Sequence, residues 1–249
     1  MKQIILSGCN GKMGHVISDI VMGRDDCTIV AGFDLNTQRQ YDYPVYAMPS
    51  EYTGGGDVII DFSHPSLLST LLDYAEEKKI PIVLATTGYS KAQLEEIHAA
   101  AQRLPVFFSA NMSLGINLMV ELAKKAASVL GGSFDIEIIE KHHNQKIDAP
   151  SGTALMIADA VSGVLSEKPQ YVYDRHSQRK KRDKNEIGIH AIRGGTIVGE
   201  HDIMFAGRDE ILTISHTAMS KEVFASGAVN AAVFMCGKAP GLYNMKDMV

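Results

Sequence analysis

A glycine-rich segment near the start of the chain constrains the fold more than any other feature. Gly8, Gly11 and Gly14 lie between an apolar run at Gln3–Leu6, typical of a buried strand, and a helically spaced stretch at Met13–Met22. Glycine permits backbone conformations that other residues resist and lets a pyrophosphate approach backbone N–H groups closely. The following helix presents its positive N-terminal end to the phosphates. The segment predicts a dinucleotide-binding βαβ start.

One acidic residue strengthens this prediction. The pattern GxxGxxG departs from the common GxGxxG, so the glycines alone are a weak signal. Asp34 comes at the end of the second predicted strand, Thr28–Phe33, 20 residues after Gly14. A carboxylate at that point accepts hydrogen bonds from an adenosine ribose. From the residues alone, a glycine turn in a non-binding α/β domain stays open as the alternative.

The first half of the chain alternates short β-branched runs with amphipathic stretches. Strands are predicted at Val58–Phe62, Ile82–Leu84 and Val106–Ser109, with helices from Pro65 to about Lys78 and at Gln93–Arg103. Strands that are apolar throughout are typical of a parallel sheet with both faces covered. The fold class expected is therefore α/β, with a Rossmann-type doubly wound parallel sheet.

The pattern changes after about Ser113, which predicts a second, mixed α/β domain. A helix at Gly115–Leu130 is expected to stop at Gly131-Gly132, a typical helix end. Several strands then follow with few helices between them, which favours an antiparallel or mixed sheet. The apolar positions of the first helix are Leu118, Met119, Leu122, Ala126 and Val129. The later predicted elements are a strand at 136–139, a helix at 153–165, strands at 187–192, 196–205 and 210–217, and a last helix at 221–236.

The segment from Glu140 to Thr153 is predicted to be a loop that carries chemistry, because it leaves a strand and enters a helix. His142, His143 and Lys146 lie close together in it, and histidine exchanges protons near neutral pH. Small residues at the start of the next helix leave its N–H groups accessible to an anion. These features suit a substrate that bears carboxylates. Adjacent histidines rarely bind one ion, so no metal is predicted.

Composition excludes several other classes of protein. The net charge of −5 argues against a nucleic-acid partner, and the basic run QRKKRDK at 178–184 is interpreted as a solvated, mobile loop. Cys9, Cys27 and Cys236 are too few and too scattered for a disulfide framework or a CxxC metal site. No secretory leader or membrane-spanning run is evident, so we expect no membrane partner and a cytoplasmic location.

These features favour a nicotinamide-dependent oxidoreductase, and two alternatives are weighed, one of the same broad fold and one from another class of protein. Tyr74 and Lys78 match the YxxxK pattern of short-chain dehydrogenases, but that pattern lies much further from the glycine loop in those enzymes. Here it is interpreted as spanning an exposed helix face. A sensor that binds the cofactor without chemistry is the second alternative. The histidine–lysine segment argues against it, because a sensor needs no proton donor.

Taken together, the motifs resemble the 4-hydroxy-tetrahydrodipicolinate reductase family, also called dihydrodipicolinate reductase, and the match covers nearly the whole chain. The most specific block runs from His142 to Ala154. The other matching segments are Gly8 to Gly14, Asp61-Phe62-Ser63 with Pro65, Ala85-Thr86-Thr87-Gly88, Ser109-Ala110-Asn111-Met112, Val198-Gly199-Glu200-His201 and Pro240-Gly241-Leu242-Tyr243.

The resemblance implies a specific function and organisation. Such enzymes reduce a cyclic hydroxy-imine dicarboxylate to tetrahydrodipicolinate with loss of water, using NADH or NADPH, in the diaminopimelate route to lysine. The implied domains are residues 1–113 with 221–249 for the dinucleotide, and 114–220 for substrate binding and homotetramer formation. His142 and Lys146 would be catalytic, and His143, Gly152 and Thr153 would bind the substrate. The implied cofactor residues are Gly8, Cys9, Asn10, Gly11, Lys12, Met13, Asp34, Ala85, Thr86, Thr87, Ser109, Ala110, Asn111 and Met112.

The residues after Asp34 bear on the choice of nicotinamide cofactor. Some relatives carry a basic residue directly after the acid, where it meets a 2′-phosphate. Here Leu35 and Asn36 follow, and Asp34 would repel that phosphate, which favours NADH. Lys12 in the loop could still reach a phosphate, so use of both cofactors stays open.

Overall fold

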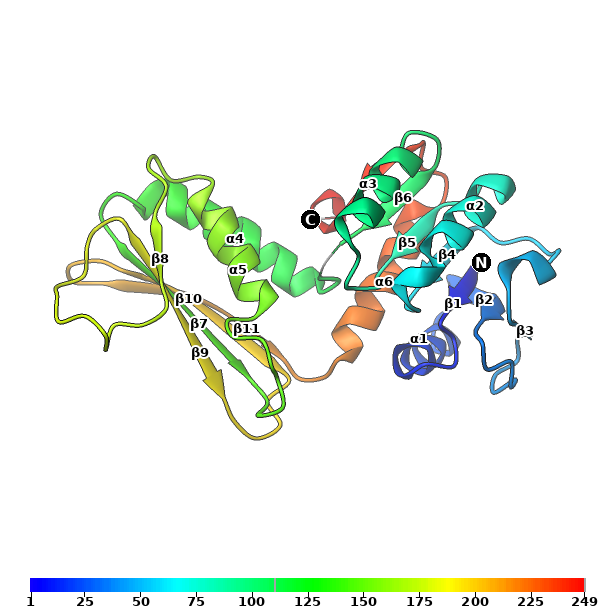
Figure 1. Ribbon diagram of the computed structural model, residues 1–249, viewed down its shortest axis with the longest axis horizontal. Helices are drawn as coiled ribbons and strands as arrows, with labels where there is room; N and C mark the ends of the chain where they lie inside the picture. Colours follow the sequence, from blue (N-terminus) through cyan, green and yellow to red (C-terminus); the bar gives the residue numbers. More distant parts are fainter. Residues whose placement is uncertain (110, 249) are drawn as a thin grey trace. The chain divides into compact units, whose positions relative to one another are not determined.

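The buried residues of the first strand show how the first half of the chain builds its sheet. Ile4 and Leu6 of β1 (Lys2–Ser7) pack into one apolar cluster, while Ile5 packs into another. Because successive side chains of a strand point to opposite faces, β1 lies in a sheet covered on both sides. The computed structural model, which describes residues 1–109 and 111–248, has this arrangement (Figure 1).

The chain divides into two compact units, of which the first comprises residues 1–114 and 222–249. Within the described residues its strands are all parallel, in the order β12-β6-β5-β4-β1-β2-β3. In a doubly wound sheet of this kind the strand order reverses beside β1, and ligands bind outside the carboxyl ends of the strands at that point. After β1, the strands are β2 (Cys27–Phe33), β3 (Val45–Tyr46), β4 (Val58–Asp61), β5 (Ile82–Leu84), β6 (Pro105–Phe108) and β12 (Gly241–Tyr243).

Helices cover both faces of this sheet. α1 (Lys12–Met22) and α6 (Glu222–Met235) pack on the cluster that contains Ile4 and Leu6. α2 (Leu68–Lys78) and α3 (Lys91–Ala100) pack on the opposite cluster, around Ile5. Single 3-10 turns occur at η1 (Pro49–Glu51), η2 (Pro65–Leu67) and η3 (Met245–Met248).

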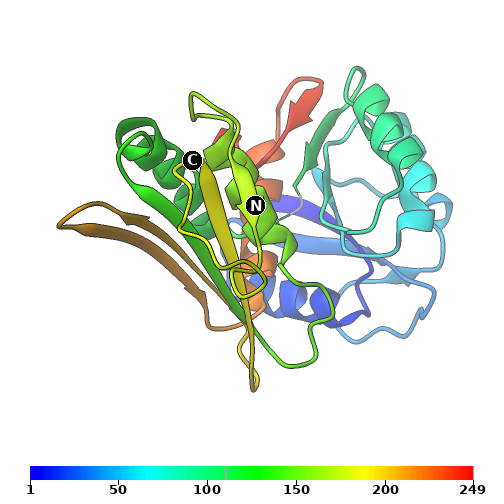
Figure 2. The same cartoon turned by 60° about the vertical axis from the view of Figure 1, so that its left-hand side comes forward.

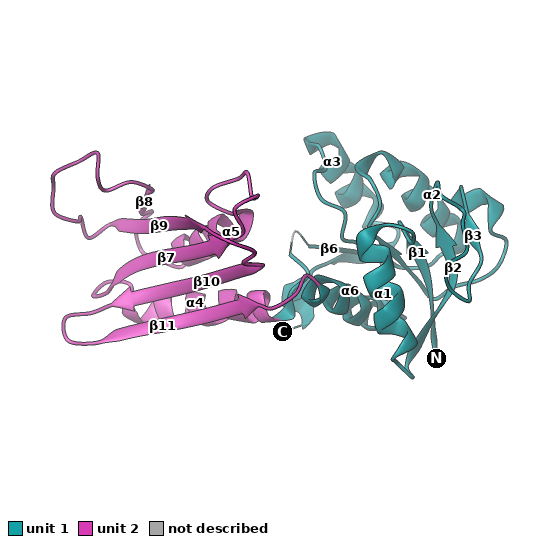
Figure 3. Cartoon of the chain, turned by 90° about the horizontal axis from the view of Figure 1, so that it is seen from below, with its two compact units in different colours: residues 1–114, 222–249 teal, residues 115–221 magenta. Residues whose placement is uncertain are grey.

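The second unit, residues 115–221, is a mixed sheet with helices on one face (Figure 3). The strand order is β11-β10-β7-β9-β8, in which β7, β9 and β8 run parallel and β10 is antiparallel to both of its neighbours. Figure 2 shows the twist of these strands. The elements are α4 (Leu114–Leu130), β7 (Asp135–His142), α5 (Gly152–Ser162), β8 (Gln170–Val172), β9 (Glu186–Arg193), β10 (Gly199–Ala206) and β11 (Ile211–Ala218).

Several element boundaries differ from those predicted. β3, β8 and β12 were not predicted, because two or three residues are too few for a periodic signal. α3 begins two residues before the predicted Gln93, because Ser90 caps it and pairs with Gln93 in a capping box. It ends at Ala100, short of the predicted Arg103.

The buried faces of two helices differ from the sequence pattern. Of the five apolar positions named on α4, Met119 is buried and Ala126 packs against the core, whereas Leu118, Leu122 and Val129 are exposed. Val120 and Ala123 lie in the core as well. The apolar residues of α4 are too evenly distributed for the sequence to show which stripe is buried. On α2, Tyr74 was assigned to an exposed face but is buried. Its ring packs edge-on against Phe33, with 5.5 Å between ring centroids.

Candidate active site

The turn between β1 and α1 is shaped by two positions that exclude any side chain. Gly8 has a φ angle of +77°, and a Cβ built on it would lie 2.6 Å from the carbonyl oxygen of Phe62. A Cβ on Gly14 would collide with the carbonyl oxygens of Gly8 and Cys9. α1 begins after Gly11 without a side-chain cap, so no side chain competes with a phosphate for its first N–H groups. The turn fits a dinucleotide pyrophosphate.

Three of the predicted cofactor residues direct their side chains into the core of the first unit. Cys9 is fully buried, and burial raises the pKa of its thiol to about 12. Met112 is also buried, and Met13 packs against the same cluster. Because their side chains pack into the core, these residues can offer a cofactor their backbone groups or shape the surrounding loop. Lys12, in contrast, is exposed.

The Asp34 carboxylate is attached directly to the glycine turn. Its Oδ2 atom accepts a hydrogen bond of 3.0 Å from the backbone N–H of Asn10, and its Oδ1 atom accepts one of 2.9 Å from the N–H of Asn36. The Asn10 side chain donates to the Asn36 carbonyl at 2.5 Å. A carboxylate has about four acceptor sites, so Asp34 retains capacity for ribose hydroxyls. This geometry suits the adenosine half of a dinucleotide.

Asp61, a buried acid at the end of β4, connects the loop after β4 with the loop after β5. Asp61 accepts hydrogen bonds from the N–H of Ser63 at 3.1 Å and from the hydroxyls of Thr86 at 2.7 Å and Tyr89 at 3.3 Å. Burial, together with the Asp61 charge, holds the pKa of the Tyr89 phenol well above its usual range. Sequence reasoning included Asp61 only as part of a family motif, because an acid at a strand end has no spacing signal of its own.

The remaining predicted cofactor residues lie in the loops after β5 and β6. Ala85 donates its N–H to the Asp61 carbonyl at 3.0 Å, whereas Thr87 is exposed. The Ser109 hydroxyl donates to the Asn111 carbonyl at 2.8 Å. Ala110, also predicted to contact the cofactor, lies outside the described residues.

In the second unit, the predicted loop starts later than expected. Glu140 and His142 still belong to β7, which is held between β9 and β10 and therefore continues to His142. The Glu140 side chain is fully buried, and its Oε2 atom lies 2.6 Å from Nδ1 of His142. The His142 ring is largely buried but not closed off, with 12% of its side chain exposed. This pair places a histidine with a fixed orientation at the end of a strand.

Arg193, the last residue of β9, binds the same carboxylate. Its guanidinium forms two hydrogen bonds of 2.7 Å with the two oxygens of Glu140, a bidentate pair. Burial alone would raise the pKa of Glu140, but the hydrogen bonds from Arg193 and His142 hold that pKa below its usual range. Arg193 also donates to the Asp148 carbonyl at 2.7 Å, which fixes the loop after His142. No sequence pattern pointed to Arg193.

The N-terminus of α5 joins this network through Ser151. Its N–H donates to Oε1 of Glu140 at 2.9 Å, and its hydroxyl accepts from the Ala154 N–H at 3.2 Å as the helix cap. The hydroxyl also lies 3.1 Å from Nε2 of His201, a buried residue of β10. Burial lowers the pKa of His201 to about 4, so this imidazole is neutral near pH 7.

The other predicted catalytic and substrate residues surround this network. Nζ of Lys146 lies 2.8 Å from Oδ1 of Asp148, and that contact holds the Asp148 pKa below its usual range. His143 is half-buried, and its carbonyl accepts from the N–H of Lys146 at 3.1 Å. Gly152 and Thr153 open α5, and a Cβ on Gly152 would meet no atom within 4 Å. Lys146 thus has a carboxylate partner within its own loop, whereas the space around Gly152 at the start of α5 is open.

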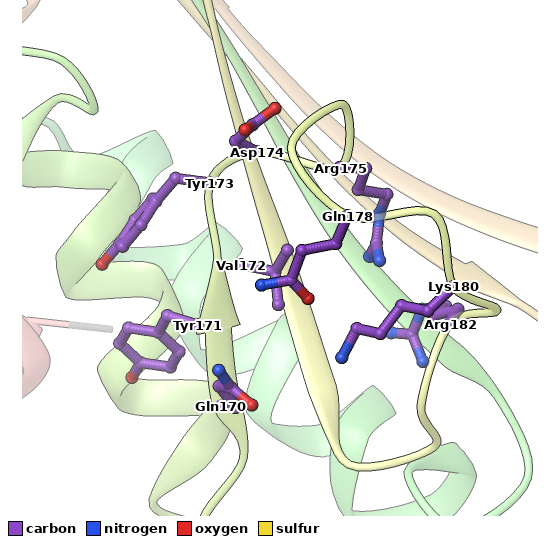
Figure 4. A pocket seen from close by; sticks show the side chains of 9 residues that line it. All are labelled: Gln170, Tyr171, Val172, Tyr173, Asp174, Arg175, Gln178, Lys180 and Arg182. Carbon is purple, nitrogen blue, oxygen red and sulfur yellow. The ribbon is translucent and has the colours of Figure 1, made fainter.

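The basic run at 178–184 was expected to be a solvated, mobile loop, and the structure has a loop there that is exposed except at the half-buried Arg182. Arg182 binds Glu137 at 2.9 Å, and Lys180 binds Asp183 at 2.7 Å and Glu186 at 3.2 Å. These cations line a cavity of about 210 Å³ between β8 and its following loop (Figure 4). Carboxylates therefore contact both of these cations.

Within residues 1–109 and 111–248, no group of three or more histidine, cysteine, aspartate or glutamate side chains is arranged to hold a metal ion. In the same residues, every helix is too short or too polar to cross a membrane.

A doubly wound sheet with an uncapped glycine turn and an acid held beside that turn is typical of a dinucleotide-binding domain. The second unit adds an oriented histidine, a lysine and an open helix N-terminus, which are groups suited to proton transfer and anion binding. Together they define a dinucleotide-dependent oxidoreductase.

Comparisons with known proteins narrow this class to one family. The family model for the dihydrodipicolinate reductase N-terminus matches residues 2–112, and the model for its C-terminus matches residues 115–249. A 4-hydroxy-tetrahydrodipicolinate reductase from Caldanaerobacter subterraneus subsp. tengcongensis is 54% identical, covering 100% of this chain and 98% of the relative. One from Clostridium tetani is 52% identical, covering 100% and 97%. The chain belongs to the dihydrodipicolinate reductase family.

A solved structure agrees with this result. The dipicolinate-bound dihydrodipicolinate reductase from Paenisporosarcina sp. TG-14 superposes with a TM-score of 0.84 at 26% sequence identity, and each chain covers all of the other. A probable dehydrogenase from Thermotoga maritima, at 12% identity and a TM-score of 0.66, shares the fold. The predicted family, the predicted fold class and the prediction of a reductase are therefore confirmed.

Proposed function

We propose that the protein reduces 4-hydroxy-tetrahydrodipicolinate to tetrahydrodipicolinate and water, with His142 as proton donor. The hydroxyl leaves as water together with a ring proton, which produces a conjugated imine, and this imine then takes up one hydride and one proton. A nicotinamide cofactor supplies the hydride when bound. Hydride addition to a conjugated imine increases electron density at the ring nitrogen and the adjacent carbon, and an acid must neutralise it. The observation that carries the proposal is the contact between Glu140 and His142.

The orientation of His142 suits this role. Because Nδ1 faces the Glu140 carboxylate, Nε2 is the ring nitrogen that can deliver a proton. A Cβ on Gly199 would lie 3.1 Å from this Nε2 atom. The glycine therefore leaves space at the nitrogen that would deliver the proton.

The substrate carboxylates would bind to Lys146, His143 and the first residues of α5. Lys146 already pairs with a carboxylate, that of Asp148, and so a substrate carboxylate can replace this partner. The N–H groups at the start of a helix favour anions, and the space at Gly152 admits one. Lys146 would also stabilise negative charge that develops during hydride transfer.

The cofactor is proposed to bind the first unit, residues 1–114 with 222–249, and NADH is proposed to be preferred. The support comes from Asp34, which is held at the glycine turn and would repel a 2′-phosphate. The second unit would bind the substrate. We place the reaction in the cytoplasm, where nicotinamide cofactors are available.

A homotetramer is proposed to form through the sheet of the second unit. α4 and α5 cover one face of this sheet (Figure 3), and the other carries partly exposed side chains such as Met204. Sedimentation of the wild type and of Met204→Arg tests this. A wild-type tetramer that the substitution dissociates is expected, and a wild-type monomer would contradict it.

The function is tested by following NADH oxidation with the product of pyruvate and aspartate semialdehyde condensation. His142→Gln is expected to lower kcat by about 100-fold or more, the usual contribution of a general acid. Its Kd for NADH should be unchanged, because His142 lies in the other unit. Near-wild-type kcat in this variant would remove His142 from the role, and no NADH oxidation by the wild type would favour a sensor.

A further inference from the structure

We propose that Glu140 is a positioning residue that aligns the proton donor His142 with the substrate-binding end of α5. The proposal rests on the proposed role of His142. Glu140 and His142 are two residues apart on β7, so their side chains share one face of the sheet. Glu140 contacts His142 with one oxygen and the N–H of Ser151 with the other.

The first oxygen determines which ring nitrogen of His142 carries a proton. A carboxylate can only accept, so the short contact of 2.6 Å with Oε2 of Glu140 requires a proton on Nδ1. The neutral ring is then the Nδ1–H tautomer, and the transferable proton resides on Nε2. Orientation of a histidine through its second nitrogen is a common means of preparing it for catalysis.

The second oxygen connects this histidine to the substrate side of the site. Ser151 directly precedes Gly152, so the bond from its N–H to Oε1 of Glu140 fixes the start of α5. Arg193 binds both oxygens and also the Asp148 carbonyl. One buried carboxylate thus joins a strand, a helix start and the loop that carries Lys146.

Charged and titratable groups face Glu140 and His142 from each neighbouring strand. Arg193 faces the carboxylate from β9, and His201 faces the His142 ring from β10, with 5.3 Å between ring centroids. His216 on β11 lies beyond His201 and interacts with it electrostatically. Ser151 is the α5 residue that contacts the network, and it is uncharged. Glu140 is therefore the anion in direct contact with the ring, and its removal leaves Arg193 unopposed.

The matched control is Glu137, on the same strand. Its carboxylate also binds a histidine, with 2.7 Å between its Oε2 and Nε2 of His190, and it also pairs with Arg175 and Arg182. Replacement of either glutamate by glutamine breaks a carboxylate–histidine–arginine group. Glu137→Gln therefore removes an equivalent set of contacts from the same strand without changing the contacts of His142.

The test compares Glu140→Gln with Glu137→Gln. Glu140→Gln is expected to lower kcat by about 100-fold with KM for NADH unchanged. Glu137→Gln should retain the wild-type kcat. A wild-type kcat in Glu140→Gln would overturn the proposal.

A second measurement determines the tautomer of His142 in the wild-type enzyme. Nitrogen-15 NMR of the wild-type enzyme is expected to show the Nδ1–H tautomer of His142, whose signal is assigned as the one missing from His142→Gln. The Nε2–H tautomer would overturn the proposal. If His142→Gln retains turnover, the proposed function of His142 fails. If His142→Gln is inactive while Glu140→Gln behaves as the wild type, only the role of Glu140 fails.

Discussion

The backbone N–H of Asn10 donates a hydrogen bond of 3.0 Å to the carboxylate of Asp34. This contact links the glycine turn after β1 to the acid after β2, so the proposed phosphate and ribose sites form one connected structure. A carboxylate held by two backbone donors cannot easily move away from an added phosphate. Its fixed position is the physical reason to expect NADH over NADPH.

Leu35→Arg is expected to raise kcat/KM for NADPH by about 10-fold, because a guanidinium beside Asp34 would pair with the 2′-phosphate. Leu35 is 87% exposed, so the change should not affect folding. Steady-state kinetics with both cofactors tests this, and Leu35→Gln is the uncharged control. A wild-type preference for NADPH would show that the argument from Asp34 is wrong.

Gly8→Ala is expected to reduce NADH affinity by at least about 10-fold and to destabilise the fold by about 1–3 kcal/mol. The cause is its positive φ angle and the close carbonyl of Phe62. Isothermal titration with NADH and urea unfolding measure the two effects. Gly55→Ala is the control, because a Cβ there meets no atom within 4 Å. Equal NADH affinity in Gly8→Ala and the wild type would count against the proposed phosphate site.

Lys146→Ala is expected to raise KM for the substrate and to lower kcat, each by about 10-fold or more, through loss of a carboxylate partner and of transition-state charge stabilisation. Lys141→Ala is the matched control from the same segment. Lys141 pairs with Glu200 at 2.9 Å and Asp202 at 3.3 Å, so its loss should leave both constants unchanged. Equal kinetics in the two variants would contradict the role of Lys146.

The buried imidazole of His201 predicts a loss of stability in mild acid. Its pKa is about 4 in the folded protein and 6.5 as the ordinary value. Between these values the unfolded chain takes up a proton that the folded chain does not, so stability falls as the pH decreases. The free energy of unfolding should drop by about 2 kcal/mol from about pH 7 to about pH 5 on account of this residue. Urea unfolding measures the drop, which His201→Gln should remove; an unchanged drop would contradict the assignment.

Local sequence patterns were enough to predict those features that depend on residues close together in the chain. The glycines at 8, 11 and 14, between a strand and a helix, predicted the turn that the structure contains. Runs of apolar residues predicted the parallel sheet, because burial on both faces requires them. His142 and Lys146 were singled out because they lie only four positions apart, within one segment.

Residues that act through distant partners were invisible to the same reasoning. Glu140 binds Arg193, 53 positions away, and His201 reaches Ser151, 50 positions away. Nothing in the local pattern of a strand distinguishes such residues from other polar positions. The boundary of β7 was missed for a related reason, since its pairing with β9 and β10 extends it to His142.

By itself, the sequence determined the order of the longer strands and helices, the glycine turn and the chemical types available for catalysis. Each of these depends on backbone conformation and periodic burial over a few consecutive residues. Only the tertiary structure decided which carboxylate meets which cation, which α4 stripe is buried, and which His142 nitrogen faces Glu140. Those outcomes depend on strand pairing between segments far apart in the chain. The low dielectric of the buried site strengthens the hydrogen bonds and ion pairs that form there.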